Sequence, residues 1–358
     1  MLTTKEVIEA MFDFPYYQEV EIVSLAESGA SGPKVVIVFS KSENKHYVLK
    51  YGKTRVPIKT QIQNRSLLEP FLEEYLPQVI GYREFSDGEE AMKMEYAGPH
   101  NFHQIVIRSI LPDAECLEIW QRVLRAVKRV WHESKRDFSG TENYPRRPKE
   151  RVVRVINSLL RTVVDNSVLN ENKDLLLRIN NQKFPSLSDT FEILSQRTVD
   201  PSLTVFCHND LNADNIIVDE ELKWHLIDWE WVGETDWTLS LSHLIGWWIS
   251  NATRQRDWPT LKVQDNHLCF SYSFHLPPIF IELIEAVYGL GKDFATEAGD
   301  SDWEQRLITH LAIFLFGEIR FLAARDRLLY FIPFLGEGVR MLSQGQELGS
   351  FLDEWKGV

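Results

Sequence analysis

Three oxygen-bearing side chains follow one another within a single stretch of the chain, residues 206–230 (FCHNDLNADNIIVDEELKWHLIDWE). Asp210 comes first, within HND; Asn215 follows in NII, and Asp228 lies in the apolar-flanked IDWE. An aspartate on a short loop can accept the proton of an attacking hydroxyl, while an amide oxygen and a second carboxylate are the hard ligands that Mg²⁺ prefers. This order of groups fits phosphoryl transfer, in which the protein mainly positions the reactants and neutralises charge.

The same stretch resembles the aminoglycoside phosphotransferase and choline/ethanolamine kinase superfamily, most strongly over residues 203–231. FCHND followed by NII is similar to choline and ethanolamine kinases, and IDWE is similar to both branches. The resemblance implies a protein-kinase-like fold. It further implies that Asp210 is the catalytic base, that His208 braces the loop, and that Asn215 and Asp228 hold Mg²⁺. HxD alone is more often an ordinary hydrogen-bonded pair, so the whole series carries the argument.

The elements before this stretch indicate a small sheet with one helix. VVIVFS (35–40) and HYVLKY (46–51) are rich in β-branched and aromatic residues and predict a hairpin through KSEN. VIGYREF and EEAMKMEY predict a second pair of strands across SDGEE. Between the pairs, apolar residues from Ile62 to Leu76 recur at helical spacing and stop at Pro77.

The resemblance also implies a nucleotide clamp in this front part. Lys50, in YVLKYG, corresponds to the strand lysine that pairs with the α- and β-phosphates of ATP. Ser28 and Gly29, in SGASG, can bring backbone N–H groups close to phosphates, and the backbone of Met94 and Tyr96, in MEYAGPH, is expected to bind the adenine edge. Without the resemblance, these features would indicate a solvated lysine, a plain turn and an ordinary strand exit.

The first helix departs from the superfamily, which usually carries there a glutamate that anchors the strand lysine. Counting back from the end of the helix places Asn64 or Arg65 at that position. Two alternatives follow: Glu69 or Glu73 takes the role, or Lys50 lacks a carboxylate partner.

A second departure lies twelve residues after Asp228, where Ser240 replaces a common aspartate that braces the catalytic loop; Asp236 stands four residues earlier. Together the two departures motivate an alternative function, a catalytically weak nucleotide-binding pseudokinase that acts as a scaffold or sensor. The intact series of Asp210, Asn215 and Asp228 favours an enzyme over this alternative.

Aromatic and acidic side chains crowd the region after Asp228. The resemblance implies that the acceptor sits among helices of the second lobe, against side chains that suit an ammonium group. Glu230, Asp236 and Trp248 are the candidate acceptor contacts, although aromatic residues at this spacing more often belong to a core. The expected acceptor is a small, cationic molecule, aminoglycoside-like or choline/ethanolamine-like.

Composition excludes several other classes. A net charge of −13 opposes binding to nucleic acid. Three cysteines without a CxxC pair indicate neither a disulfide framework nor a zinc site, and they favour a reducing compartment. The first residues, MLTTKEVIEAMFDF, are too charged for a signal peptide, and LITHLAIFLFGEIRFLAAR carries charges that are costly in lipid. We therefore expect a cytoplasmic protein that does not enter the membrane.

The predicted fold class is α+β, a two-lobed protein-kinase-like fold with a small antiparallel-sheet lobe and a larger, mainly helical lobe. The nucleotide-clamping lobe is expected at 1–97, and the helical lobe, with the catalytic loop and acceptor pocket, at 98–358. Helical spacing over 102–194 and after residue 239 supports this division. The expected activity is transfer of the γ-phosphate of ATP, with Mg²⁺, to a hydroxyl of a small molecule. IDWE in place of DFG, and no APE landmark, disfavour a protein kinase.

Overall fold

The structure is a computed structural model. It describes residues 2–12, 16–26, 32–138, 155, 157, 167–197, 200–251, 259–323 and 331–356. These residues form two compact units. The first comprises Met1–Pro112 with Ala213–Gly233, and the second Asp113–Asn212 with Glu234–Val358. The first unit therefore runs past residue 97 and includes a later segment, while the predicted lobe boundary stays a prediction.

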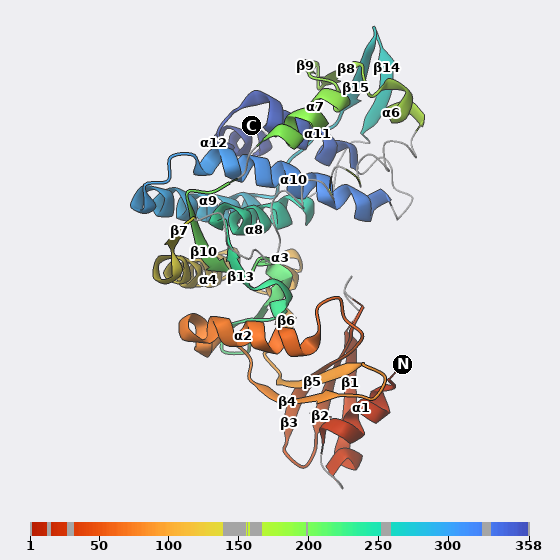
Figure 1. Cartoon of the computed structure of the whole chain (residues 1–358), viewed down its shortest axis with the longest axis vertical. Coiled ribbons are helices and arrows are strands. Elements are labelled where there is room, and N and C mark those ends of the chain that lie inside the picture. Colours follow the sequence, from red (N-terminus) through yellow and green to blue (C-terminus); the bar gives the residue numbers. More distant parts are fainter. Residues whose placement is uncertain are drawn as a thin grey trace. The chain divides into compact units, whose positions relative to one another are not determined.

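The first unit is built on a five-stranded antiparallel sheet in the order β1-β2-β3-β5-β4 (Figure 1). Both predicted hairpins are confirmed. Alternate residues of β2 are buried, as expected for a strand with one face on a core, and Val36, Val38 and Leu49 pack there with Val7 and Ile8 of α1. The elements of this sheet and its flanks are α1 (Thr4–Met11), a 3-10 turn (Tyr16–Glu19), β1 (Val20–Ala26), β2 (Lys34–Ser40), β3 (Lys45–Gly52), α2 (Ile58–Leu72), a 3-10 turn (Glu73–Tyr75), β4 (Val79–Glu84) and β5 (Glu90–Glu95).

The predicted helix exists as α2, but it begins and ends earlier than the apolar spacing indicated. It starts directly after Pro57, whose backbone lies outside the helical region, and it continues through Pro70. A 3-10 turn, Glu73–Tyr75, then leads to Pro77. The earlier start matters because it adds one further turn, including Gln61, to the part of the helix that is buried.

The remainder of the first unit is a second, three-stranded sheet in the order β12-β11-β6. Its register places Ile216 opposite Leu226 and Val218 opposite Trp224. The predicted strand in KWHLIDWEW is thereby confirmed. The elements are β6 (His100–Asn101), α3 (Phe102–Ile107), the 3-10 turn η3 (Ala213–Asn215), β11 (Ile216–Val218), β12 (Trp224–Leu226) and the 3-10 turn η4 (Trp229–Trp231).

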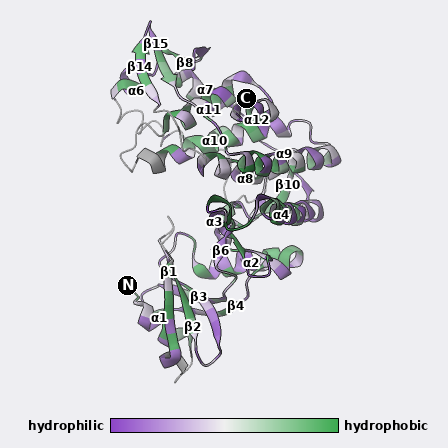
Figure 2. Ribbon diagram, turned by 180° about the vertical axis from the view of Figure 1, so that it is seen from behind, coloured by the Kyte–Doolittle hydropathy of each residue, from purple (hydrophilic) through white to green (hydrophobic). Residues whose placement is uncertain are grey.

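The second unit is mainly helical, as predicted. Its centre is α8, which is almost wholly buried and packs on α10, and Figure 2 shows the hydrophobic colouring of this helix. Beside it lies β10, the predicted strand before HND. The elements are α4 (Asp113–Ser134), β7 (Arg136–Asp137), α6 (Ser167–Asn172), β8 (Leu176–Ile179), β9 (Gln182–Phe184), α7 (Leu187–Gln196), β10 (Leu203–Cys207), β13 (Gly233–Thr235), α8 (Trp237–Asn251), β14 (Thr260–Gln264), β15 (His267–Ser271), α9 (Pro278–Ala298), α10 (Trp303–Ala323), α11 (Ile332–Gln344) and α12 (Leu348–Trp355).

The expectation of helix throughout 102–194 and after residue 239 was wrong in part of each region. A four-stranded sheet in the order β14-β15-β8-β9 interrupts both regions. Its two tight turns carry Asn180-Asn181 and Asp265-Asn266, all four with positive φ. Two-residue loops between hairpin strands need this conformation. The Asn-Asn and Asp-Asn pairs are therefore the turn signals in the sequence, and the helical spacing of the apolar residues around them obscured these signals.

No helix among the described residues is long and apolar enough to cross a membrane.

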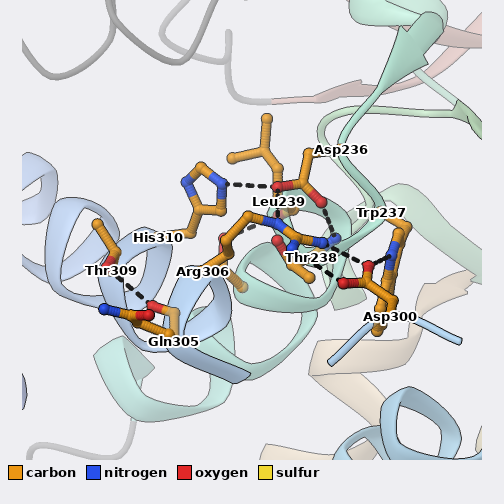
Figure 3. A network of polar contacts seen from close by, with 10 residues as sticks. Asp236, Trp237, Thr238, Leu239, Asp300, Gln305, Arg306, Thr309 and His310 are labelled. Atoms are coloured by element: carbon orange, nitrogen blue, oxygen red, sulfur yellow. Dashed lines mark hydrogen bonds and ion pairs between the residues drawn. The ribbon is translucent and has the colours of Figure 1, made fainter. Parts of the chain in front are cut away.

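A buried ionic network holds the start of α8 against α10 (Figure 3). Arg306 donates through Nε to Asp236 (3.0 Å) and through Nη1 and Nη2 to the two carboxylate oxygens of Asp300 (3.0 and 2.6 Å). His310 Nε2 lies 3.3 Å from Asp236, and the indole of Trp237 donates to Asp300 at 3.0 Å. Burial by itself would raise the pKa of Asp236, but the His310 hydrogen bond and the Arg306 charge outweigh it and lower that pKa.

We predict that Asp236→Asn destabilises the protein at pH 7 by about 3 kcal/mol, because a buried arginine loses one of its charged partners. The wild-type advantage is present above the ordinary aspartate pKa of 3.8 and is lost as the pH falls through the lowered, folded value. The difference in the free energy of unfolding between wild type and variant should therefore narrow below about pH 4. Urea unfolding at pH 7 and pH 3.5 measures it, with the exposed Asp293→Asn as control. A gap that stays constant with pH would contradict the charged role of Asp236.

Candidate active site

Lys50 is a buried cation of the first unit whose partners come from distant parts of the sequence. It lies on β3, between Val35 of β2 and Met92 of β5. Its Nζ donates to Asp228 Oδ1 at 2.7 Å and to Gln61 Oε1 at 2.9 Å, and it lies 3.7 Å from Glu230 Oε1. The side chain is 8% exposed. A buried ammonium group requires such partners, because leaving water unpaired is very costly.

The anchor of Lys50 differs from both alternatives that the sequence left open. Glu69 forms an ion pair with Arg65 instead, and Lys50 does have carboxylate partners. The helix contributes the neutral amide of Gln61, which also donates to Val56 O at 2.8 Å and lies 3.4 Å from Glu230 Oε1. Gln61 of the helix and the carboxylates of Asp228 and Glu230 thus share the role that a single helix glutamate usually fills in the superfamily.

Asn64, one of the two residues expected at the glutamate position, donates to backbone rather than to Lys50. Its amide nitrogen donates to the carbonyl oxygens of Trp229 and Glu230, at 3.0 and 3.2 Å. Helix α2 therefore fixes the segment directly after Asp228 at two successive peptide groups. The sequence motif could not indicate this contact, because it depends on the register of the helix against that segment.

The β11–β12 hairpin brings the two predicted metal ligands to the same end. Asn215 directly precedes β11, Asp228 follows β12, and the backbone N–H of Ile227 donates to the carbonyl oxygen of Asn215 at 3.0 Å. Asp228 adopts a left-handed conformation, with φ 63° and ψ 63°, which is uncommon for a residue with a side chain. The hairpin thus joins Asn215 to the residue before Asp228, and an amide with a carboxylate is a donor set that suits a hard divalent cation.

A histidine next to this hairpin supports it. His103, on α3, lies with Nδ1 3.1 Å from Asp214 Oδ1, one residue before Asn215. Asn101 caps the same helix by accepting a hydrogen bond from the backbone of Gln104 at 2.7 Å.

The predicted adenine-binding segment leaves β5 and passes close to β11. Gly98 has φ +147°, and a Cβ atom there would clash with the backbone of Val218, so glycine is required for this approach. Met94 is buried in the sheet, and the ring of Tyr96 lies 5.4 Å from that of His46 along a surface cavity of about 860 Å³. Adenine binding by Met94 and Tyr96 stays a prediction. Ser28 and Gly29 lie outside the described residues.

The loop that carries Asp210 belongs to the second unit and is held from several sides. Ser134 Oγ accepts from the backbone N–H of Phe206 at 2.9 Å, and Asn212 Nδ2 donates to the carbonyl oxygen of Asp210 at 3.1 Å. Asn209 is fully buried with φ 61°. His208 is also buried, which is compatible with the predicted bracing role.

Ser240, the second departure from the superfamily, contacts the strand before this loop. Burial raises the pKa of the Cys207 thiol to about 12, although hydrogen bonds with Ser240 and Trp131 oppose the rise. Ser240 thus touches the residue next to His208 and contributes a neutral contact at the place where the superfamily commonly has a charged one.

A residue that the sequence did not single out lies against Asp210. His243, on α8, has Nδ1 3.4 Å from Asp210 Oδ1. The histidine side chain is 5% exposed and the aspartate side chain 31%. A helical position fifteen residues after Asp228 carries no local motif, so only the packing of α8 reveals this contact.

The three candidate acceptor contacts are all buried. Trp248 is fully buried, with its ring 5.8 Å from that of Trp120 and 5.0 Å from that of Phe280. Asp236 has no exposed surface and belongs to the ionic network of Arg306. Glu230 is buried beside Lys50. Burial speaks against direct contact with an acceptor, because an acceptor must reach the side chain from solvent.

Residues 98–269 match the family model described as choline/ethanolamine kinase. A search of curated proteins finds no match.

Solved structures extend the likeness over nearly the whole chain. A choline kinase from Cryptosporidium parvum Iowa II has a TM-score of 0.51 at 14% identity, covering 98% of this chain and 100% of that one. A Plasmodium vivax ethanolamine kinase has 0.51 at 10%, covering 94% and 86%. A thermostable mutant of the aminoglycoside phosphotransferase APH(4)-Ia, in a complex with AMP-PNP and hygromycin B, has 0.52 at 12%, covering 90% and 94%.

The chain has the kinase-like fold of these solved structures. At these identities the solved structures establish the fold alone. The predicted fold class is thereby confirmed.

We predict that Lys50→Met destabilises the first unit by about 3 kcal/mol, because Glu230 and Asp228 then lose a buried cationic partner. Lys34→Met, on the neighbouring strand β2, replaces a lysine at an exposed position and should change the free energy of unfolding by less than about 0.5 kcal/mol. Chemical denaturation compares the two. Equal stability of both variants would show that the Lys50 contacts contribute nothing to folding.

Proposed function

We propose that this protein is a small-molecule kinase that transfers the γ-phosphate of ATP to a hydroxyl group of an amine-bearing acceptor. The observation that carries the proposal is the contact of Lys50 with Asp228, residues 178 positions apart in sequence. A phosphate-binding lysine and a metal-binding aspartate act on the same phosphate chain in phosphoryl transfer. Their direct contact fits a site built for a nucleotide with its cation.

Asp210 is the proposed base. The acceptor hydroxyl loses its proton to the Asp210 carboxylate while its oxygen forms a bond to the γ-phosphorus, and the bond from that phosphorus to the β,γ-bridging oxygen breaks, releasing ADP. The transition state is loose, so the carboxylate mainly orients the hydroxyl and takes its proton late. An exposed fraction of 31% leaves the Asp210 side chain accessible to such a partner.

Asn215 and Asp228 are the proposed ligands of Mg²⁺. A cation bound there would supply positive charge against the charge that develops on the β- and γ-phosphates. The Asn215 amide oxygen and the Asp228 carboxylate would hold it, and the hydrogen bond from the Ile227 N–H to the Asn215 carbonyl oxygen joins the two chain segments that carry them. Lys50 holds the nucleotide phosphates and, before nucleotide binds, keeps the Asp228 carboxylate oriented.

The acceptor is proposed to be cationic, like choline, ethanolamine or an aminoglycoside. The match to the choline/ethanolamine kinase model, the names of the similar solved structures and the net charge of −13 support this class. Because Asp236 and Trp248 are buried, we propose that other acidic and aromatic side chains contact the acceptor.

A pseudokinase is the second candidate, and Gln61 in place of a helix glutamate is the observation that favours it. A neutral amide holds Lys50 less strongly than a carboxylate would. The ion pairs of Lys50 with Asp228 and Glu230 support the enzyme instead.

Asp210→Ala is expected to lower kcat by at least a hundredfold, because the attacking hydroxyl loses its base. The measurement is ADP release with Mg-ATP against choline, ethanolamine, homoserine, aminoglycosides and neutral sugars. Asp293→Ala, a change at an exposed position of α9, is the control. Wild-type turnover in the Asp210 variant would refute the role of Asp210, and ATP binding without transfer to any acceptor would favour the pseudokinase.

Asp228→Asn is expected to raise the Mg²⁺ concentration needed for half-maximal activity about tenfold or more, because a neutral amide is a weaker ligand for a hard cation than a carboxylate. Titration of activity with MgCl₂ at saturating ATP measures this. An unchanged Mg²⁺ requirement would place the cation on other ligands.

A further inference from the structure

We propose that His243 is a positioning residue for the catalytic base: it holds one carboxylate oxygen of Asp210 so that the other faces the attacking hydroxyl. This inference rests on the proposed function. Its basis is the 3.4 Å approach of His243 Nδ1 to Asp210 Oδ1 within the second unit.

The chemistry of the two groups fixes the direction of this contact. An ionised carboxylate only accepts hydrogen bonds, so Nδ1 carries the hydrogen. At 3.4 Å the contact is long, and catalytic hydrogen bonds often tighten only when reactants are bound. His243 contacts Oδ1, and we assign the proton of the hydroxyl to the other carboxylate oxygen, Oδ2. The imidazole keeps its own proton throughout, and the balance of the transfer is unchanged.

The packing around His243 limits the orientations of its ring. The ring of Phe314, on α10, lies edge-on to it with centroids 5.4 Å apart and an interplanar angle of 76°. Phe314 can lie there because position 246, one turn along α8, is glycine: a Cβ at Gly246 would come within 2.5 Å of Phe314 Cδ1. Gly246, Phe314 and His243 therefore form a packed series that ends at the carboxylate of Asp210.

The contact of His243 with Asp210 is one that a histidine buried only for packing would not need. A histidine that only filled space could be replaced by another ring of similar volume, whereas here a polar atom is directed at a partly exposed carboxylate. Holding such a carboxylate in one rotamer lowers the entropy that must be lost on reaching the transition state. The expected consequence is a change in kcat rather than in nucleotide binding, because the contacts of Lys50 lie in the first unit.

The test compares three substitutions of His243 in the full chain. His243→Asn places an amide nitrogen where Nδ1 lies, and it should keep kcat within about threefold of wild type. His243→Gln carries its amide one carbon further, nearer the position of Nε2, and His243→Phe keeps only the ring. Both should lower kcat by about tenfold to a hundredfold, with the KM for ATP within about twofold. Ser242→Ala, a buried change at the preceding position, is the control.

Thermal unfolding of each variant separates a folding defect from a catalytic one. Equal kcat for the Asn, Gln and Phe variants, or a rise in the KM for ATP at constant kcat, would overturn the inference. Its failure is distinct from failure of the proposed function. In the first case wild type transfers phosphate and Asp210→Ala does not; in the second, wild type itself transfers none.

Gly246→Ala supplies a second, remote test, since the added methyl must displace Phe314. We expect a fall in kcat with the same unchanged KM for ATP, and a smaller fall when His243 is already Phe, because the two changes act through one contact. Additive effects of the two substitutions would contradict the packed series.

Discussion

The burial of the Lys50 ammonium group is the constraint on which the first unit depends. A charge that leaves water must find partners, and those of Lys50 come from a helix, Gln61, and from the segment after β12, Asp228 and Glu230. The sheet, α2 and the hairpin are thereby required to meet at one point. Removing any of them would leave a buried charge without part of its compensation.

The same constraint accounts for local features that would otherwise be unfavourable. Asp228 occupies a left-handed conformation that costs about 1 kcal/mol for a residue with a side chain. The Lys50 contact and the two hydrogen bonds from Asn64 to the following peptide groups offset this cost. Strained backbone at an aspartate is therefore maintained by the surrounding structure, as is common where a side chain must be aimed at a ligand.

The sequence predicted the elements that depend on local patterns and missed those that depend on how elements meet. Runs rich in β-branched and aromatic residues and turn signals located four of the five strands of the first sheet, and the series through Asp210, Asn215 and Asp228 carried the resemblance to the superfamily. Gln61 was missed because α2 starts earlier than its apolar spacing indicates. The positive-φ asparagine turns of the last sheet were obscured by apolar runs that helices share.

Burial, which a sequence does not state, explains the remaining differences at the site. Asp236 and Trp248 seemed suited to an ammonium acceptor by residue type, yet each is fully enclosed, one by Arg306 and the other by Trp120 and Phe280. His243, by contrast, belongs to no motif that the sequence analysis could identify. Its significance comes from the side of α8 on which it lies and from a glycine one turn away that admits Phe314.

The proposed base and the proposed metal ligands belong to different units. Asp210 and Asn215 are five residues apart, but the boundary between the units falls between Asn212 and Ala213. The contacts described for each residue come from its own unit: His243 for Asp210, and the hairpin with His103 beside it for Asn215. Part of the support of the base and part of the support of the metal ligands therefore come from different contacts. We expect a substitution at His243 to act mainly on proton transfer, and one at His103 to act mainly on the hairpin that carries Asn215.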